Sequence, residues 1–235
     1  MALWVGTSGY NYPEWRGSFY PEKLPAAKML PYYAERLSTV EINNTFYRMP
    51  TEKSVDGWSR ATPAGFRLTL KAPQQITHVA RLRDCAAAVR RFIDVAQTLG
   101  AKLGALLFQL PPYLRANQAL LQEFLRQLPQ DLPAAFEFRH GSWFSEQTFD
   151  LLHECAYALC VSDSEKLSTP PRVTARYAYF RLRDEGYQPA DLRRWAARIR
   201  ELTADCEDVF VYFKHEEAGK GPQFARLFLE AWASG

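Results

Sequence analysis

The stretch Thr39-Val40-Glu41-Ile42-Asn43-Asn44-Thr45 decides the fold, because apolar and polar side chains alternate in it and it ends in amide and hydroxyl groups. Such alternation is typical of a β-strand. Other strand-like stretches also end in charged or amide residues, at 66–71, 103–109, 134–139, 159–163, 177–181 and 209–214. Around a closed parallel sheet, these ends would place a ring of polar groups at one rim, where TIM barrels carry their sites.

Eight strands are expected, and stretches of helical periodicity separate most of them. The expected strands begin near Leu3, Thr39, Phe66, Leu103, Ala134, Ala158, Tyr177 and Val209. Alternating elements in this number predict an α/β fold, a compact (β/α)8 TIM barrel formed by one domain over residues 1–235. The link 164–176 contains Pro170-Pro171 and is short, so we expect a reduced or missing helix between strands 6 and 7.

Two helices carry boundary signals in the sequence. Asp84 is expected to cap a helix that Gly100 ends. Pro189 stands where the first turn of a later helix tolerates proline.

The composition is that of a globular protein. Apolar residues make up 47% of the chain, and the net charge of +3 does not by itself indicate nucleic acid. The four cysteines form no CxxC pair and have no metal-ligand spacing, so we expect reduced thiols in a cytoplasmic protein. No apolar run approaches bilayer length, so we expect no membrane partner. The sequence does not indicate an oligomeric state.

The first long loop, residues 9–21, is rich in aromatic side chains. Tyr10 and Trp15 are the candidates for ligand contact, because polar-tipped aromatics at a barrel mouth can stack on a sugar or a base. The alternative, which we favour, is that these side chains pack as a plug against neighbouring loops.

Short motifs along nearly the whole chain carry a family resemblance. They include Gly6-Thr7-Ser8-Gly9-Tyr10, residues 40–48, Lys71-Ala72-Pro73, Gln109-Leu110-Pro111-Pro112 and Glu137-Phe138-Arg139-His140. Together they resemble the YecE-like family, the domain of unknown function numbered 72. The resemblance implies a TIM barrel loosely similar to sugar-isomerase barrels, and it implies no reaction. The chain departs from the family pattern at Arg183-Asp184, where a His-Gly pair is common, and at Lys214-His215, where an Asn pair is frequent.

Polar residues at the strand ends are the candidates for a site. The candidate catalytic residues are Glu41, Lys71, Glu137 and Asp163, with a carboxylate as general acid or base. The candidate substrate-binding residues are Tyr10, Trp15, Asn43, Gln109, Arg139, Arg181 and Lys214. In this scheme Arg139 and Arg181 hold an anionic group by paired donors. The alternative is a buried ion network without a ligand, formed by Glu41, Lys71, Glu137 and Arg139.

Two further signals bear on the ligand. Lys71 would form a Schiff base only with a lowered pKa; Arg139 would lower this pKa and Glu137 would raise it, so an electrostatic role is preferred. Gly219-Lys220-Gly221 stands where many TIM barrels bind phosphate, and a plain turn into the last helix explains it equally well. Together with Arg181 and Lys214, it favours an anionic ligand.

No cofactor is expected to be obligatory. The carboxylates of Glu41, Glu137 and Asp163 would suit Mg²⁺ or Mn²⁺, but the basic residues beside them disfavour an obligatory metal. The four histidines are too scattered for a His-rich zinc site; His78 and His140, just beyond strand ends, are candidates for proton transfer.

The sequence favours an enzyme, hydrolase or sugar-isomerase-like, that acts on a small anionic, phosphorylated or carbohydrate-like substrate by acid/base chemistry at the carboxyl rim. The alternative is a nucleic-acid-binding or processing protein that uses the aromatic loop and an arginine-rich stretch, residues 172–200. Several of these arginines fall on an outer helix face, where solvated charge is the ordinary explanation. A catalytically inactive binding barrel is the third reading.

Overall fold

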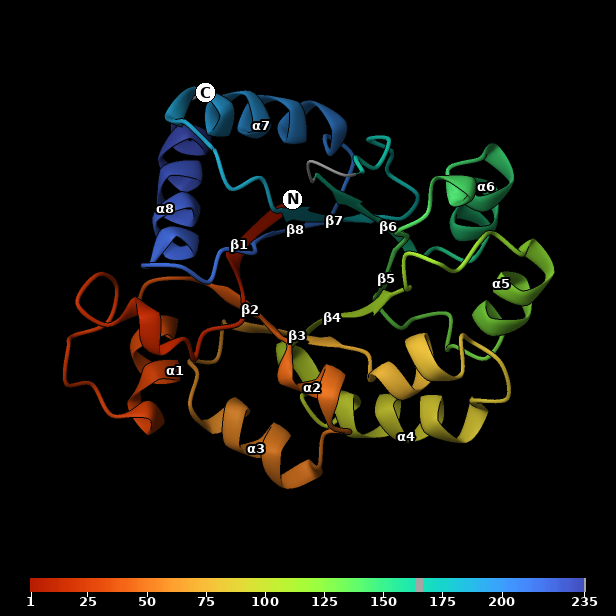
Figure 1. Cartoon of the computed structure of the whole chain (residues 1–235), viewed down its shortest axis with the longest axis horizontal. Helices are drawn as coiled ribbons and strands as arrows, with labels where there is room; N and C mark the ends of the chain where they lie inside the picture. Colours follow the sequence, from red (N-terminus) through yellow and green to blue (C-terminus); the bar gives the residue numbers. More distant parts are fainter. Residues whose placement is uncertain (164–166, 235) are drawn as a thin grey trace.

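A computed structural model describes residues 1–163 and 167–234, and its eight parallel strands close into a barrel in sequence order (Figure 1). The strands are β1 (Ala2–Ser8), β2 (Thr39–Ile42), β3 (Arg67–Lys71), β4 (Leu103–Gln109), β5 (Ala134–Glu137), β6 (Ala158–Ser162), β7 (Tyr177–Leu182) and β8 (Asp208–Phe213). Pairing of β1 with β8, from Ala2 opposite Asp208 to Thr7 opposite Phe213, closes the sheet. The predicted (β/α)8 barrel is confirmed, and each strand begins within one residue of its expected start.

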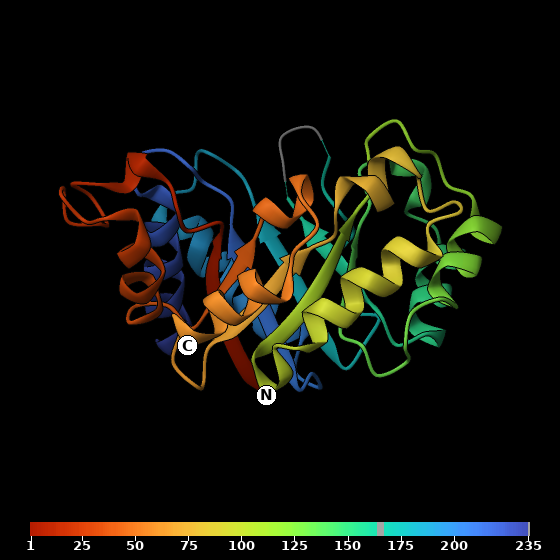
Figure 2. The ribbon, with the colours of Figure 1, turned by 90° about the horizontal axis from the view of Figure 1, so that it is seen from below.

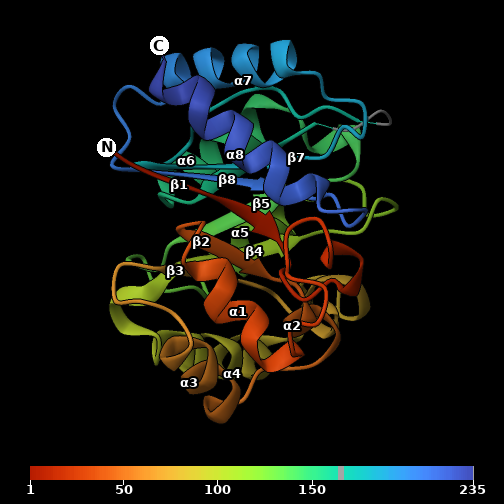
Figure 3. The same ribbon diagram turned by 90° about the vertical axis from the view of Figure 1, so that its left-hand side faces the viewer.

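Helices surround the barrel (Figures 1 and 2). They are α1 (Ala26–Ala34), α2 (Asn44–Tyr47), α3 (Glu52–Arg60), α4 (Ala86–Gln97), α5 (Gln118–Leu125), α6 (Glu146–Glu154), α7 (Pro189–Leu202) and α8 (Lys220–Ala233). Helices α7 and α8 pack on each other at one side, and both chain termini lie toward the amino end of the barrel (Figure 3). No helix in the described part of the chain is long and apolar enough to cross a membrane.

The link between β6 and β7 contains no helix in its described residues, 163 and 167–176, which agrees with the prediction. Instead, hydrogen bonds to β6 and to Tyr157, the residue just before β6, hold this link in place. Thr174 Oγ1 accepts from Leu159 N at 2.8 Å and donates to the Tyr157 carbonyl at 2.7 Å. The Thr169 amide donates to the Ser162 carbonyl at 2.9 Å.

One helix start differs from its prediction. Asp84 does not cap α4: it adopts a φ of +44°, and Cys85 occupies the N-cap without a side-chain hydrogen bond. The preceding turn uses left-handed backbone at Arg81 and Leu82 as well, and it buries the Leu82 side chain. Helix α4 ends at Gln97, before Gly100, whereas Pro189 begins α7 as expected.

The barrel interior consists of two layers, and this positions the site. Near its middle, aromatic rings from β7 and β8 pack against small residues of the facing strands, in a cluster of Ala105, Leu107, Ala135, Ala158, Cys160, Tyr179, Phe210 and Tyr212. Gly104 makes this possible, because a Cβ there would lie 3.1 Å from the Phe210 ring. Tyr212 then bonds to the hydroxyls of Thr39 (2.8 Å) and Thr69 (2.7 Å). The next inward-facing residues toward the carboxyl ends are polar.

Candidate active site

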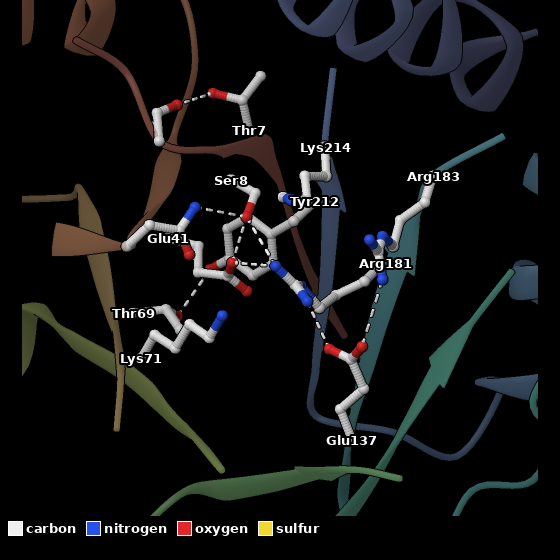
Figure 4. A network of polar contacts seen from close by, with 12 residues as sticks. Thr7, Ser8, Glu41, Thr69, Lys71, Glu137, Arg181, Arg183, Tyr212 and Lys214 are labelled. Carbon is white, nitrogen blue, oxygen red and sulfur yellow. Dashed lines mark hydrogen bonds and ion pairs between the residues drawn. The ribbon is translucent and has the colours of Figure 1, made fainter. Parts of the chain in front are cut away.

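Arg181 lies at the centre of the polar layer, wholly buried between two carboxylates from other strands (Figure 4). Its Nη2 lies 2.8 Å from Glu41 Oε1, and its Nη1 pairs with Glu137 Oε2. Burial alone would lower the pKa of Arg181, but Glu137 and Glu41 raise it well above its usual value. Burial alone would raise the pKa of Glu137, but Arg181, Arg183 and Lys71 bring it below its usual value. Arg181 and Glu137 are therefore both charged, and Arg181 holds the two carboxyl groups in place.

The Glu41 carboxylate receives further hydrogen bonds from two neighbouring strands. Ser8 Oγ, at the end of β1, donates to Oε1, and the Tyr179 hydroxyl on β7 donates to Oε2. Asn43 Nδ2 donates to Ser8 Oγ at 2.8 Å, as does Arg181 Nη2. Burial, and then the charge of Glu41, raise the pKa of Tyr179 well above its usual value, so its hydroxyl keeps its proton. Both oxygens of the Glu41 side chain are consequently held by hydrogen bonds.

Lys71 lies at the end of β3, and its amino group points toward this cluster (Figure 4). The side chain is only 9% exposed, and its Nζ lies 4.1 Å from the centre of the Phe46 ring. Among the described residues, no carboxylate oxygen lies within ion-pair distance of Nζ. Burial, and then the positive charge of Arg181, lower the pKa of Lys71 to about 8. Lys71 is therefore a desolvated amine that exchanges its proton near neutral pH.

Three more cations surround the network closer to solvent. The side chains of Arg139, Arg183 and Lys214 are between 19% and 32% exposed. Arg139 Nε and Arg183 Nη1 lie 3.2 and 3.6 Å from Glu137 Oε1, and Lys214 Nζ lies 3.9 Å from Glu216. A cavity of about 320 Å³ adjoins Arg183 and Lys214, and its lining is Arg183, Glu185, Lys214, His215, Glu216, Glu217 and Lys220.

Several buried polar atoms of this site have no hydrogen-bond partner among the residues that the structure describes. They are Asn43 Oδ1, Glu137 Oε1, Arg181 Nε and Arg183 Nη1. Buried polar groups in folded proteins are nearly always hydrogen-bonded, so each such atom calls for an explanation. Glu137 Oε1 and Arg183 Nη1 face each other as an ion pair at 3.6 Å, so Asn43 Oδ1 and Arg181 Nε are the two atoms for which a polar ligand could supply a partner.

Most of the predicted site residues come together here. The structure gathers Glu41, Lys71, Glu137, Asn43, Gln109, Arg139, Arg181 and Lys214 at the carboxyl end, with Gln109 opposite Glu137 in the β4–β5 pairing. The alternative of a buried ion network holds only in part. Arg181 pairs with Glu41 and Glu137, and Arg139 lies 3.2 Å from Glu137, but Lys71 forms no ion pair among the described residues. Arg181 is not placed to grip a ligand through paired donors, because both of its terminal nitrogens are committed to buried carboxylates and Ser8.

Three predicted residues lie apart from the network. Asp163 accepts from the Arg183 amide at 2.6 Å and from the Tyr187 hydroxyl, so it braces the loop after β7; burial raises its pKa. Trp15 is fully buried and its Nε1 donates to the Glu216 carbonyl at 2.9 Å. The half-buried Tyr10 packs toward Tyr33, with ring centres 6.5 Å apart. The aromatic loop is thus a packed plug.

The glycines of Gly219-Lys220-Gly221 have a packing explanation. Gly219 is the N-cap of α8 with a φ of +73°, which favours glycine. A Cβ on Gly221 would lie 2.9 Å from the His215 carbonyl oxygen. Lys220 Nζ lies 3.7 Å from Glu217. Phosphate binding at this turn stays a prediction.

The carboxylates considered for Mg²⁺ or Mn²⁺ do not converge. Glu41 and Glu137 each face Arg181, and Asp163 faces Tyr187. Over residues 1–163 and 167–234, no three or more His, Cys, Asp or Glu side chains are grouped so that they could hold a metal ion. His78, whose pKa burial and then Lys71 lower, packs on Phe46 beside Lys71, whereas His140 bonds to Ser142.

Sequence reasoning did not select four residues of the site: Ser8, Phe46, Tyr179 and Arg183. Strand alternation places Tyr179 on the same side as Arg181 without giving it a role, and it could have found Arg183, two residues after Arg181. Ser8 is the polar end of β1, and the same reasoning from polar strand ends would have selected it. No local signal places Phe46 against Lys71, since the two belong to different βα units.

Comparison with known proteins agrees with this fold and these motifs. The sequence model described as "Protein of unknown function DUF72" matches residues 4–235. The UPF0759 protein YunF of Bacillus subtilis (strain 168) is 25% identical over 268 residues, spanning 97% of this chain and 94% of the relative. The UPF0759 protein YecE of Escherichia coli (strain K12) is 29% identical over 168 residues, spanning 69% of this chain and 59% of the relative.

Two solved structures of DUF72 family proteins are also similar. The protein from Thermotoga maritima MSB8 is 27% identical with a TM-score of 0.87, covering 98% of both chains. The protein from Enterococcus faecalis V583 is 19% identical with a TM-score of 0.84, covering 98% of this chain and 95% of the other, and it has the same fold. Because the family match spans nearly the whole sequence, this chain belongs to the DUF72 family of proteins of unknown function.

Proposed function

We propose that this protein is an enzyme that binds a small anionic substrate at the carboxyl end of the barrel and transforms it by proton transfer. One observation carries the proposal: the cationic side chains of the site outnumber its carboxylates. In the buried polar layer, Lys71, Arg139, Arg181, Arg183 and Lys214 stand against two carboxylates, Glu41 and Glu137. Three more glutamates, Glu185, Glu216 and Glu217, line the adjoining cavity together with Lys220, and Glu216 lies 3.9 Å from Lys214. Uncompensated charge in a partly buried site is costly, and an anionic ligand would offset that cost.

The substrate contacts follow from exposure and hydrogen bonding. Arg139, Arg183 and Lys214 reach solvent and would hold a phosphate or carboxylate group. Asn43 Oδ1 is a buried acceptor without a hydrogen bond among the described residues, and a substrate hydroxyl would donate to it. The substrate we propose is therefore anionic and hydroxylated, as a sugar phosphate or sugar acid is.

Proton transfer is assigned to Lys71. Its pKa of about 8 lies close enough to neutral pH for the side chain to act as an acid and as a base. Glu41 accepts bonds from Ser8, Tyr179 and Arg181, so its role is to fix the geometry of the site.

A thermal-shift experiment with inorganic phosphate, a sugar phosphate and the corresponding free sugar tests this proposal. Binding at saturating concentration should raise the unfolding midpoint of the wild type by about 5 °C for the sugar phosphate, and less for the free sugar. Arg183→Gln should lose most of that shift, whereas Arg193→Gln, on the exposed face of α7, should keep it. Equal shifts in the two variants, or no shift with any anion in a wide metabolite panel, would count against the proposal.

The nucleic-acid alternative has less support, because much of the arginine-rich stretch is already paired. Arg172 and Arg176 form ion pairs with Glu146 and Glu207, and Arg194 pairs with Asp191. Arg200 lies over the Trp232 ring at 4.6 Å and bonds to the Trp232 carbonyl. Salt-dependent binding to single- or double-stranded oligonucleotides would support the nucleic-acid alternative.

We place the reaction in the cytoplasm, and the state of the cysteines supports this location. Cys85, Cys155, Cys160 and Cys206 are free thiols, and all but Cys155 are buried. Free thiols persist in a reducing compartment. Secretion through an oxidising compartment with full activity would argue against it.

A further inference from the structure

Lys71 differs from a second partly buried lysine of this chain in how its amino group is satisfied. Lys102, at the amino end of β4, donates to the carbonyl oxygens of Ser59 (2.5 Å) and Thr62 (2.6 Å), so its ammonium is well solvated by the protein. Lys71 has no ion pair in the described part of the chain, and its Nζ faces the Phe46 ring at 4.1 Å. Lys102 therefore serves as an internal reference for the behaviour of Lys71.

The two carboxylates nearest to Lys71, those of Glu41 and Glu137, are bound by other side chains. Glu41 and Glu137 are engaged by Arg181, and the hydroxyls of Ser8 and Tyr179 also occupy Glu41. The charged and titratable groups that act on Lys71 are Arg181, Glu137, Glu41 and Lys214, and His78 borders it across Phe46. A desolvated lysine beside another cation is the environment in which a lysine amine becomes a nucleophile.

We propose that Lys71 captures the carbonyl carbon of an anionic aldehyde or ketone as a covalent imine. The inference rests on the proposed function, because Arg139, Arg183 and Lys214 would bind the anionic end of the same molecule. A hydroxyl of that molecule would donate to Asn43 Oδ1. The substrate class is thus a hydroxy-aldehyde or hydroxy-ketone that carries a phosphate or carboxylate.

The chemical step balances without any further reactant. The neutral amine adds to the carbonyl carbon, which forms the C–N bond and places the carbonyl electron pair on oxygen. The oxygen then leaves as water with both hydrogens from the nitrogen of the original ammonium, and a protonated imine remains. One ammonium and one carbonyl compound give one protonated imine and one water. The positive charge is conserved on the Lys71 nitrogen, which in the imine no longer acts as acid or base itself. It draws electrons from the neighbouring carbon instead, and this eases loss of the proton on that carbon.

Reductive trapping with two matched probes tests this imine. Glycolaldehyde phosphate and glycolaldehyde are each incubated with the protein and sodium cyanoborohydride, and the modified lysines are mapped by mass spectrometry of peptides. Lys71 should be modified at least about tenfold faster than Lys102 or the exposed Lys53, because its lowered pKa provides more free amine at neutral pH. The phosphate-bearing probe should react faster at Lys71, and inorganic phosphate should slow that reaction while leaving Lys53 unaffected.

Substitutions separate this inference from the proposed function. Lys71→Arg keeps the charge and cannot form an imine, so it should lose the fast adduct, whereas Lys53→Met should keep it. If glycolaldehyde phosphate stabilises the wild type but modifies Lys71 no faster than Lys102, the imine is wrong and the anion site stands. If Lys71 is modified selectively by both probes at equal rates, the imine stands and the anion site fails. If Lys71→Arg does not fold, the wild type alone still tests both points. The rate at Lys71 relative to Lys102 tests the imine, and protection of Lys71 by phosphate tests the anion site.

Discussion

Arg181 and Glu137 form an ion pair inside the barrel with side-chain exposed fractions of 0% and 1%, and Arg181 also neutralises Glu41 across the barrel. A pair of this kind is costly to desolvate, and removal of one partner leaves an uncompensated buried charge. The arrangement thus ties the stability of the barrel to the geometry of the site.

Arg181→Met should destabilise the protein severely. The substitution leaves Glu41 and Glu137 buried without their shared counter-ion, which costs about 3–5 kcal/mol of the free energy of unfolding. Urea unfolding measures this loss, and Arg193→Met on the exposed face of α7 serves as the control with a change within about 0.5 kcal/mol. A loss at position 181 as small as that of the control would contradict a central role for this guanidinium.

Protonation of Glu137 should lower the free energy of unfolding of the protein in acid. Its cationic neighbours bring the pKa of Glu137 below the ordinary 4.5, so the unfolded chain binds the proton more readily than the folded one. This contribution to stability is complete above the ordinary pKa and is lost as the pH falls through the lower pKa of the folded state. The free energy of unfolding of Glu137→Gln, measured from about pH 6 to about pH 3, should fall less steeply than that of the wild type. Parallel curves for the two proteins would rule out this linkage.

Lys71→Met should stabilise the protein near neutral pH. Burial and Arg181 lower the pKa of Lys71 from 10.5 to about 8, so the folded state binds its proton less tightly than the unfolded chain. The charge therefore opposes folding below about pH 8, and this opposition disappears as the pH rises toward the ordinary pKa. We expect a gain of about 1–3 kcal/mol at about pH 7 that vanishes near about pH 10.5.

Chemical unfolding at the two pH values checks the Lys71→Met prediction, with Lys53→Met on α3 as the control. The control lysine is exposed and should show no such pH dependence. A Lys71→Met protein that is less stable than the wild type at both pH values would show that the amine is satisfied in the folded state.

Two glycines in helices should respond in opposite ways to alanine. Gly221→Ala places a Cβ 2.9 Å from the His215 carbonyl oxygen and 3.3 Å from Trp15, and should cost about 1–3 kcal/mol. Gly57→Ala, in the middle of α3 with nothing within 4 Å of the new Cβ, should gain about 0.4–1 kcal/mol. Thermal unfolding of both variants makes the comparison, and a neutral Gly221→Ala would show that the turn before α8 can shift.

The fold was predictable because its signal is local and repeated. Each strand ends in a polar residue or is followed directly by one, as Asn43 follows Ile42. Proline or glycine marks many of the boundaries, as Pro189 does for α7. The short link before Tyr177 was predictable for a similar reason, since its length and two prolines leave no space for a crossover helix.

The site was predictable only as a set of residues. Alternation places Arg181 inside the barrel, but barrel closure decides that it meets Glu41 and Glu137 from strands far away in the sequence. Trp15 is buried because its nitrogen finds the carbonyl of Glu216, at the other end of the chain. Asp163 likewise accepts a hydrogen bond from Tyr187, which lies beyond the next strand in the sequence. Such pairings depend on tertiary contacts that no sequence window contains.

The pairing of β1 with β8 has a consequence for how the protein is made. The first strand emerges from the ribosome early, yet one of its edges finds its partner only when residues 208–213 have been synthesised. Until residue 181 emerges, Glu41 and Glu137 also lack their cation. Until β8 has been synthesised, the sheet has an open edge, and an unpaired edge of this kind exposes a chain to association with other strands during synthesis.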